Sequence, residues 1–425
     1  MSGSSWPAPK RILVLTQYYR PEPNFITADV AEHLARNAKV TVVTAHPNYP
    51  KGRFYDGTKP WAFRRTVEHG VTVWRVPMIP DHSTSAVRRA VSYLSFAIVA
   101  LFVAPIVAPR PDVVWVYNTP FTTPLAAIWF RFVTRARIVF TAADLWPESF
   151  VASGAVGDGL LIRVAAWYSR TINRLAHDVV CVTEGIVDRY RRDGVAPSRL
   201  HMIRVWVEGA PAVAAFASGT REPRIVYAGN LGLAQQIETV IRAAAMLSAR
   251  GRQVIFDIYG SGVEAERLEA LAHELGASSV TFHGTVPPAE AFARSREAMA
   301  QVVILRQSPL FAMTVPSKLY FCFAAGAPML YALEGEAAQL VSSCDGGFAF
   351  DPSSPASLCD AIERLMDTTP TDIAAMSAAL VEKYNRKFTR TALLASYEEV
   401  LGTTAERAVP AHGVHADSPT SLEAR

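Results

Sequence analysis

Residues 224–247 read RIVYAGNLGLAQQIETVIRAAAML, and this stretch decides the fold. The short apolar run Arg224 to Tyr227 ends in a glycine-rich turn, which passes into a segment with helical spacing of its apolar residues. Gly229 and Gly232 let the backbone turn tightly, and the first amides and dipole of the following helix can hold a phosphate. The stretch therefore predicts a phosphate-binding strand, turn and helix, although a glycine turn alone also fits a plain strand-to-helix loop.

The alternation of apolar strands and amphipathic segments extends on both sides of this stretch. Before it we expect strands at Ile12 to Thr16, Val40 to Thr44, Val113 to Tyr117, Arg137 to Thr141 and Val179 to Thr183. After it we expect strands at Val254 to Tyr259, Val280 to His283, Val302 to Leu305 and Met329 to Ala332. The fold class is α/β, with two doubly wound Rossmann-like sheets and a ligand cleft at the carboxyl ends of their strands.

The chain of 425 residues, 50% of them hydrophobic, is long enough for two domains. Residues 1–205 form the first domain, the Gly, Pro and Ala-rich stretch 206–223 is the linker, and residues 224–385 form the second. Helices from about residue 386 to 402 can pack back on the first domain, and the tail 406–425 has too few large apolar residues to pack.

Charge and cysteine content exclude several classes of protein. The formal net charge of +4 is far below that of a nucleic-acid-binding surface. The four cysteines lack zinc spacing and are expected to be buried free thiols in a reducing compartment. The amino-terminal residues MSGSSWPAPKR lack the apolar core of a signal peptide, so we expect a cytoplasmic protein.

Further motifs follow in a fixed order after the glycine turn: IYGSG at 258–262, VTFHG at 280–284 and PSKLY at 316–320. This order resembles the C-terminal domain of glycosyltransferase family 4. The first half contains RILVLTQYYRPEPN, VTVVTAHPNYPKGRFYDG, RRAVSYLSF and DLWPESFVASGAV, which are similar to the branch that builds bacterial surface polysaccharides, including the WbuB-like fucosamine transferases. The resemblance spans roughly residues 10 to 402 and rests on the order of the motifs.

The resemblance implies a GT-B enzyme that transfers a sugar with retention of its anomeric configuration. Its C-terminal domain would bind a nucleoside diphosphate sugar, and its N-terminal domain would bind the acceptor, expected to be a saccharide linked to undecaprenyl diphosphate. No cofactor is implied. Because no D-x-D motif occurs in the chain, we expect no metal ion on the diphosphate.

Negative charge grows on the leaving diphosphate as the glycosidic bond breaks, so the donor site needs cations or amide donors. Lys318 and Arg306 are the available cations, although either can be a plain surface charge. Glu334 and Glu336 follow a strand and either face the donor sugar or ribose or simply begin a helix. The predicted donor-binding residues are Gly229, Asn230, Gly232, Gly260, Ser317, Glu334 and Glu336.

Two departures from the family pattern concern this donor site. Met313 and Phe321 stand where many members carry paired glutamates, one near the donor sugar and one on the ribose hydroxyls. Asn230 and the pair Gln235 and Gln236 replace the basic residues that commonly flank the glycine turn. Both changes leave more of the diphosphate charge to Lys318.

Polar residues follow two predicted strands of the first domain. Asp144 and Glu148 lie in TAADLWPES, where a carboxylate can accept the proton of the acceptor hydroxyl or bind its hydroxyls. We predict Asp144 as catalytic and Glu148 as acceptor-binding, although Asp144 followed by Pro147 also fits a helix N-cap. His46 and Asn48 in AHPNYP are predicted to contact the acceptor, and a structural loop role is equally open for His46.

Residues 90–108 read AVSYLSFAIVALFVAPIVA and contain no charge. They can form a core helix, barely span a bilayer, or lie in the membrane interface with their basic flanks on anionic headgroups. The arginines at both ends favour the third reading, which makes residues 88–110 a peripheral attachment to the inner face of the cell membrane. Three side chains are expected to face lipid: Phe96, Leu101 and Phe102.

Alternative functions remain open. A catalytically silent GT-B subunit that binds or regulates a partner transferase would account for the departures at Met313 and Phe321. A secondary-metabolite glycosyltransferase would share the motifs but use another acceptor. The nucleotide-sugar 2-epimerases share the doubled architecture but lack a membrane-facing segment.

Overall fold

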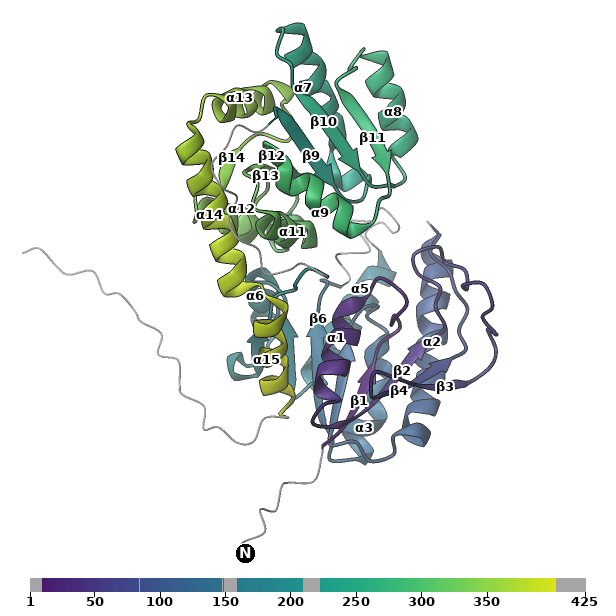
Figure 1. Ribbon diagram of the computed structural model, residues 1–425. Helices are drawn as coiled ribbons and strands as arrows, with labels where there is room; N and C mark the ends of the chain where they lie inside the picture. The colour runs from purple at the N-terminus through teal and green to yellow at the C-terminus, as the bar shows by residue number, and fades with distance from the viewer. Residues whose placement is uncertain (1–9, 84, 147, 149–158, 209–221, 403–425) are drawn as a thin grey trace, which may run out of the picture.

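The computed structural model describes residues 10–83, 85–146, 148, 159–208 and 222–402. Figure 1 shows two α/β units, each with a central sheet flanked by helices, stacked one above the other. The chain has the predicted doubly wound Rossmann-like sheets, which confirms the GT-B fold class. Most of the linker predicted at 206–223, and the tail at 406–425, lie outside the described residues.

The first sheet has eight strands in the order β3-β4-β2-β1-β5-β6-β7-β8, and every neighbouring pair is parallel except β3 with β4. Its strands are β1 (Arg11–Leu15), β2 (Lys39–Ala45), β3 (Arg64–Glu68), β4 (Val71–Val76), β5 (Val113–Tyr117), β6 (Arg137–Ala142), β7 (Asp178–Cys181) and β8 (Leu200–Met202). Its helices are α1 (Phe25–Leu34), α2 (Ala86–Val107), η1 (Thr123–Ala127), α3 (Ile128–Val133), α5 (Leu160–Leu175), α6 (Glu184–Arg192) and η2 (Pro197–Arg199).

The second sheet is entirely parallel, in the order β11-β10-β9-β12-β13-β14. Its strands are β9 (Arg224–Ala228), β10 (Ile255–Tyr259), β11 (Val280–Gly284), β12 (Ala300–Ile304), β13 (Met329–Ala332) and β14 (Gly347–Ala349). Its helices are η3 (Leu233–Gln235), α7 (Ile237–Ala249), α8 (Ala265–Glu274), α9 (Pro288–Glu297), α10 (Pro309–Ala312), α11 (Ser317–Ala325), α12 (Gly335–Ser342), α13 (Pro355–Met366) and α14 (Pro370–Lys387).

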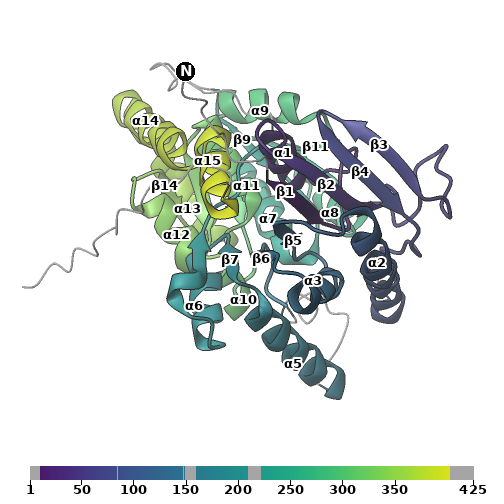
Figure 2. The ribbon, with the colours of Figure 1, turned by 90° about the horizontal axis from the view of Figure 1, so that it is seen from below.

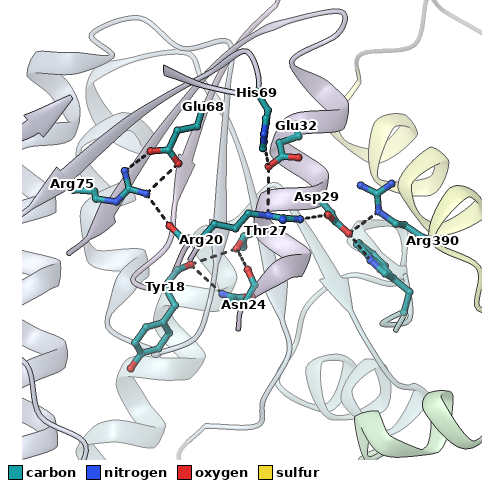
Figure 3. Close-up of polar contacts among 11 residues, drawn as sticks. Tyr18, Arg20, Asn24, Thr27, Asp29, Glu32, Glu68, His69, Arg75 and Arg390 are labelled. Atoms are coloured by element: carbon teal, nitrogen blue, oxygen red, sulfur yellow. Dashed lines mark hydrogen bonds and ion pairs between the residues drawn. The ribbon is translucent and has the colours of Figure 1, made fainter. Parts of the chain in front are cut away.

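The last helix, α15 (Arg390–Leu401), returns to the first unit, as Figure 1 shows in yellow. Its Tyr397 ring lies 5.5 Å from Trp115 of β5 and 6.2 Å from Trp206. Figure 3 shows Asp29 of α1 between two arginines, with Arg390 2.7 Å and Arg20 2.8 Å away. Burial works against the charge of Asp29, but these contacts hold its pKa below the usual value.

Helix α2 is apolar on two opposite faces. One face, which includes Phe96, Ala100 and Ala104, packs into the core beneath the first sheet. The other is exposed and carries the stripe Val87, Val91, Leu94, Ile98, Phe102 and Ile106, spaced three or four residues apart. Residues Val87–Val107 are long and apolar enough to cross a bilayer by length and composition alone, yet the buried face makes α2 part of this domain.

The expectation that Phe96 faces lipid is wrong, because its side chain is fully buried in the core. Figure 2 shows α2, α3 and α5 along one side of the first unit. Exposed apolar side chains continue from α2 onto the other two helices, as Trp129, Phe132, Val133, Val164 and Trp167.

Candidate functional site

Two glycine-rich strand ends interlock at the carboxyl edge of the second sheet. The Gly229 amide donates to the Tyr259 carbonyl at 2.9 Å, and a Cβ on Gly260, whose φ is +136°, would lie 1.8 Å from the Gly229 carbonyl oxygen. Leu231 donates to the Ser261 carbonyl, and a Cβ on Gly262 would lie 2.3 Å from the Leu231 carbonyl oxygen. Only glycine fits at 260 and 262, which explains the Gly-x-Gly that follows β10.

Lys318, in the first turn of α11, reaches this glycine turn. A Cβ on Gly229 would lie 3.1 Å from the Lys318 Nζ, so any larger residue there would crowd the ammonium group. The Nζ donates to the Tyr227 hydroxyl at 2.6 Å and lies 4.4 Å from the centre of the Tyr227 ring. Burial lowers the pKa of Lys318 to about 8. An ammonium has three N–H donors and the Tyr227 bond uses one.

The turn continues differently from the sequence prediction. The short 3₁₀ turn η3 stands between the glycine turn and α7, and the Gly232 amide donates to the Gln235 side chain at 3.1 Å. The helix predicted after the turn is α7, which begins at Ile237, after this 3₁₀ turn. The Arg306 amide donates to the Ala234 carbonyl at 2.7 Å, which brings Arg306 beside η3 with its side chain exposed.

Three other predicted donor-binding residues of this unit, Asn230, Ser317 and Glu334, have exposed or half-buried side chains. Asn230 is exposed on the glycine turn, and its carbonyl accepts a hydrogen bond from the Tyr227 hydroxyl at 2.7 Å. Ser317 is exposed as the first residue of α11, and Glu334 is half-buried just before α12. Within the described residues, no group of three or more histidine, cysteine or carboxylate side chains could hold a metal ion.

Glu336 lies in a contact between the two units. Its carboxylate accepts from the Glu184 amide at 2.7 Å and pairs with Arg204 at 2.5 Å, both contributed by the first unit. Thr183, the N-cap of α6, donates to the Met313 carbonyl at 2.9 Å. The carboxylate predicted for the donor thus joins the two units, and α6 packs against the backbone of Met313.

On the opposite side, Asp144 follows β6 at the carboxyl edge of the first sheet. Its Oδ2 accepts a hydrogen bond from the Thr119 hydroxyl at 2.9 Å, and burial raises the pKa of Asp144. Burial and, in addition, the charge of Asp144 raise the pKa of Tyr49 and Tyr93. Thr122, in the same loop as Thr119, donates to the Tyr93 carbonyl at 3.0 Å, which brings Tyr93 to this edge of the sheet. The ring of Tyr18 lies 5.2 Å from that of Tyr49. A carboxylate flanked by phenol rings can hydrogen-bond and stack on a saccharide.

Glu22 fixes the loops that carry these tyrosines. Its carboxylate accepts from the backbone amides of Tyr19, Asn48 and Tyr49 at 3.1, 2.8 and 2.8 Å. Asn48 donates from its side chain to the His46 carbonyl. Burial dominates and raises the pKa of Glu22 despite the three amides.

His46 and Asn48, which the sequence predicts as acceptor contacts, both have bonds within the loop after β2, in line with the structural role left open for His46. Both side chains are buried, and the His46 ring is bonded to the Ala62 carbonyl at 2.7 Å. Their polar atoms are used to hold the loop after β2. Glu148, also predicted to bind acceptor, is ion-paired with Arg189 of α6, which ties its segment to that helix.

The sequence reasoning missed Tyr227 and the three acceptor-side tyrosines. Tyr18 and Tyr49 each lie a few residues beyond the end of a predicted strand, and that position was the available signal. Tyr93 gave no such signal, because it lies in the long apolar segment that was interpreted as a membrane-facing helix.

Two known protein families match this chain, one over each of its two units. The family described as "Glycosyl transferase 4-like domain" matches residues 23–206, and "Glycosyl transferases group 1" matches residues 222–368. The chain belongs to glycosyltransferase family 4. The first match covers the unit that carries Asp144, and the second covers the unit that carries the glycine turn and Lys318.

Two curated relatives resemble this transferase over about two thirds of its length. A protein of Escherichia coli (strain K12) named as the colanic acid biosynthesis glycosyl transferase WcaI is 29% identical over 294 residues, which cover 64% of this chain and 71% of the relative. A Pseudomonas aeruginosa protein named as the glycosyltransferase WbjE is 22% identical over 288 residues, which cover 65% of this chain and 71% of the relative.

Solved structures share the fold at low identity. HepE of Anabaena, in complex with UDP and glucose, has a TM-score of 0.64 at 15% identity over 92% of this chain and 99% of its own. WaaG, a glycosyltransferase involved in lipopolysaccharide biosynthesis, has a TM-score of 0.60 at 16% identity over 92% and 98%.

Proposed function

We propose that this transferase moves a sugar, of hexosyl or N-acetylhexosaminyl type, from a nucleoside diphosphate to a lipid-linked saccharide in surface polysaccharide assembly. The observation that carries the proposal is the approach of the Lys318 Nζ to the Gly229 turn, opposite a sheet edge that carries Asp144. Polysaccharide assembly is supported by the name of the Escherichia coli relative, a colanic acid biosynthesis glycosyl transferase, and a nucleotide donor by the UDP bound to HepE.

The chemistry follows from the charges at the two sheet edges. Lys318 would lie beside the leaving diphosphate, where its ammonium and the amino end of α11 stabilise the charge that develops. Asp144 would accept the proton of the acceptor hydroxyl or orient that hydroxyl, and its raised pKa makes it a stronger base than an exposed aspartate. We propose that the sugar is transferred with retention, as the family resemblance implies.

The proposed location is the cytoplasmic face of the cell membrane. The exposed stripe on α2 and the exposed Trp129 and Phe132 of α3 would enter the interface, and nearby arginines would meet anionic headgroups. Tyr93 of α2 is bonded through its carbonyl to Thr122, in the loop whose Thr119 bonds Asp144, so a lipid-linked acceptor could reach the carboxylate from this helix.

Incubation with a panel of nucleoside diphosphate sugars and membrane extract tests the proposal. We expect one donor to release its nucleoside diphosphate and label a lipid product, and NMR of the product then gives its anomeric configuration. A silent subunit is the second candidate, supported by Met313 and Phe321 at the positions of the paired glutamates. Failure to bind or turn over any donor in the panel would favour that candidate.

A further inference from the structure

A basic cavity of about 640 Å³ opens at the amino ends of β1, β5 and β6, at the opposite sheet edge from Asp144. Its lining includes three arginines and an aromatic side chain: Arg11, Arg110, Arg135 and Trp129. Arg11 pairs with Asp112 at 3.4 Å, whereas in the described part of the chain Arg110 and Arg135 form no ion pair. The cavity therefore keeps a surplus of positive charge.

The rim of this cavity is apolar and faces outward. Trp129 and Val133 line it and are 46% and 57% exposed. Ile106, beside the lining residue Pro105, is 77% exposed, and Phe132 is 71% exposed. Exposed apolar side chains that gather beside a charged cavity suit a phosphate group whose attached chains continue into a hydrocarbon layer.

Helix α2 connects this cavity to the acceptor side. Near its amino end, the Tyr93 carbonyl accepts a hydrogen bond from Thr122, in the loop whose Thr119 donates to Asp144, and Pro105, near its carboxyl end, lines the cavity. The 22 residues of α2 extend about 33 Å, and the exposed stripe runs between the two ends. With α2 parallel to the bilayer, both ends would lie at the level of the headgroups.

We propose that this cavity binds the phosphodiester headgroup of an anionic phospholipid and thereby fixes the orientation of α2 on the membrane. The inference rests on the proposed membrane attachment. Arg110 and Arg135 would hold the phosphate through bidentate guanidinium bonds, and Trp129 would lie at the level of the headgroups.

Substitution of both arginines by lysine keeps the positive charge but removes the guanidinium fork. It therefore distinguishes specific binding of a headgroup in the cavity from general electrostatic attraction to the membrane. We expect the pair Arg110→Lys and Arg135→Lys to weaken partitioning into phosphatidylglycerol vesicles about fivefold, because each lysine keeps the charge but loses the two parallel bonds that a guanidinium fork gives to a phosphate. The matched control, Arg88→Lys with Arg131→Lys, changes exposed arginines of α2 and α3 outside the cavity and should bind like wild type.

The outcomes distinguish the two proposals. Equal binding by both lysine pairs would leave the membrane attachment standing and overturn the headgroup site. If wild-type protein does not bind the vesicles at low salt, the proposed membrane attachment itself is overturned. Glycerol 1-phosphate can be added as a soluble competitor of vesicle binding. If millimolar glycerol 1-phosphate releases the protein from the vesicles, the cavity binds a soluble phosphate, and the lipid assignment is overturned. Unchanged melting temperatures exclude misfolding of either pair.

Discussion

At the scale of single residues, Lys318 links the sequence motif to the chemistry. The PSKLY segment predicts its presence at the donor site, but not its burial or its bond to Tyr227, because that tyrosine lies 91 residues earlier on β9. By contrast, His46 and Asn48 follow a strand as acceptor residues would, yet their polar atoms hold a loop together. Position after a strand identifies the sheet edge, and only the fold shows which side chains there are still available to a ligand.

Lys318→Ala should reduce turnover about a hundredfold, because loss of one well-placed electrostatic donor costs about 3 kcal/mol of transition-state stabilisation. Turnover of the preferred donor and the melting temperature are the measurements. The control is Tyr227→Phe, which removes the partner of Lys318 but keeps the ring beneath its Nζ. Activity of Lys318→Ala within threefold of wild type would remove Lys318 from the mechanism.

The lowered pKa of Lys318 gives a pH dependence of opposite sign for activity and stability. Activity at low donor concentration should fall as pH rises through about 8, because the free enzyme then loses the ammonium. The unfolded chain keeps that proton to higher pH, so the contribution of Lys318 to the free energy of unfolding should increase above pH 8. Profiles of kcat/KM and of urea unfolding check the two slopes, and Lys318→Met should abolish both.

Asp144→Asn should depress transfer about a hundredfold while nucleotide affinity stays nearly unchanged, because the acceptor and donor residues lie on different sheets. An asparagine oxygen can still accept the bond from Thr119, so little stability should be lost. Because the base must be ionised, wild-type activity should rise with pH through the raised pKa of Asp144. Equal weakening of nucleotide binding, or a lower melting temperature, would assign Asp144 to the fold instead.

At the scale of elements, the ten predicted strands all appear in the structure, within two residues of their expected ends. The structure has four strands that the sequence pattern does not predict, β3, β4, β8 and β14. β3 is a charged, largely exposed edge strand, and β8 and β14 contain three residues each, too few to give a periodic pattern. β4 alternates buried and half-buried residues and pairs with β3 as a hairpin at the sheet edge.

Composition alone does not distinguish the buried face of α2 from its exposed face. Substitutions on the two faces should have different effects, on stability and on membrane binding. Leu94→Ser, Ile98→Ser and Phe102→Ser together should release the protein from anionic vesicles, because these exposed side chains would bury apolar area worth a few kcal/mol. Donor hydrolysis and the melting temperature should change little. Phe96→Ser is the control for the buried face and should cost about 3 kcal/mol or more of stability. Vesicle binding by the triple variant equal to wild type would contradict attachment through this stripe.

At the scale of the whole molecule, α15 and α6 both join the two units within the part of the chain that the structure describes. Helix α15 packs its Tyr397 and Leu401 into the core beside α1, which makes this helix part of the first unit. Helix α6 meets the segment around Met313 and Glu336 at the carboxyl edges of both sheets. Because the second contact joins the sheet edges that carry the candidate donor and acceptor residues, its making and breaking would change how closely the two substrates approach.

Gly185→Ala should open this second contact. A Cβ at residue 185 would lie 2.4 Å from the Met313 carbonyl oxygen, and the clash is with backbone, which cannot move aside as a side chain would. The nearby bonds from Thr183 and Glu184 should then be lost, each worth about 1 kcal/mol. We expect a larger radius of gyration by X-ray scattering and a transfer rate reduced tenfold or more, with nucleotide affinity of the second unit preserved. Asp188→Ala, on the exposed side of α6, is the matched control and should change neither quantity. A Gly185→Ala protein with the wild-type radius and full activity would exclude this contact as part of the active arrangement.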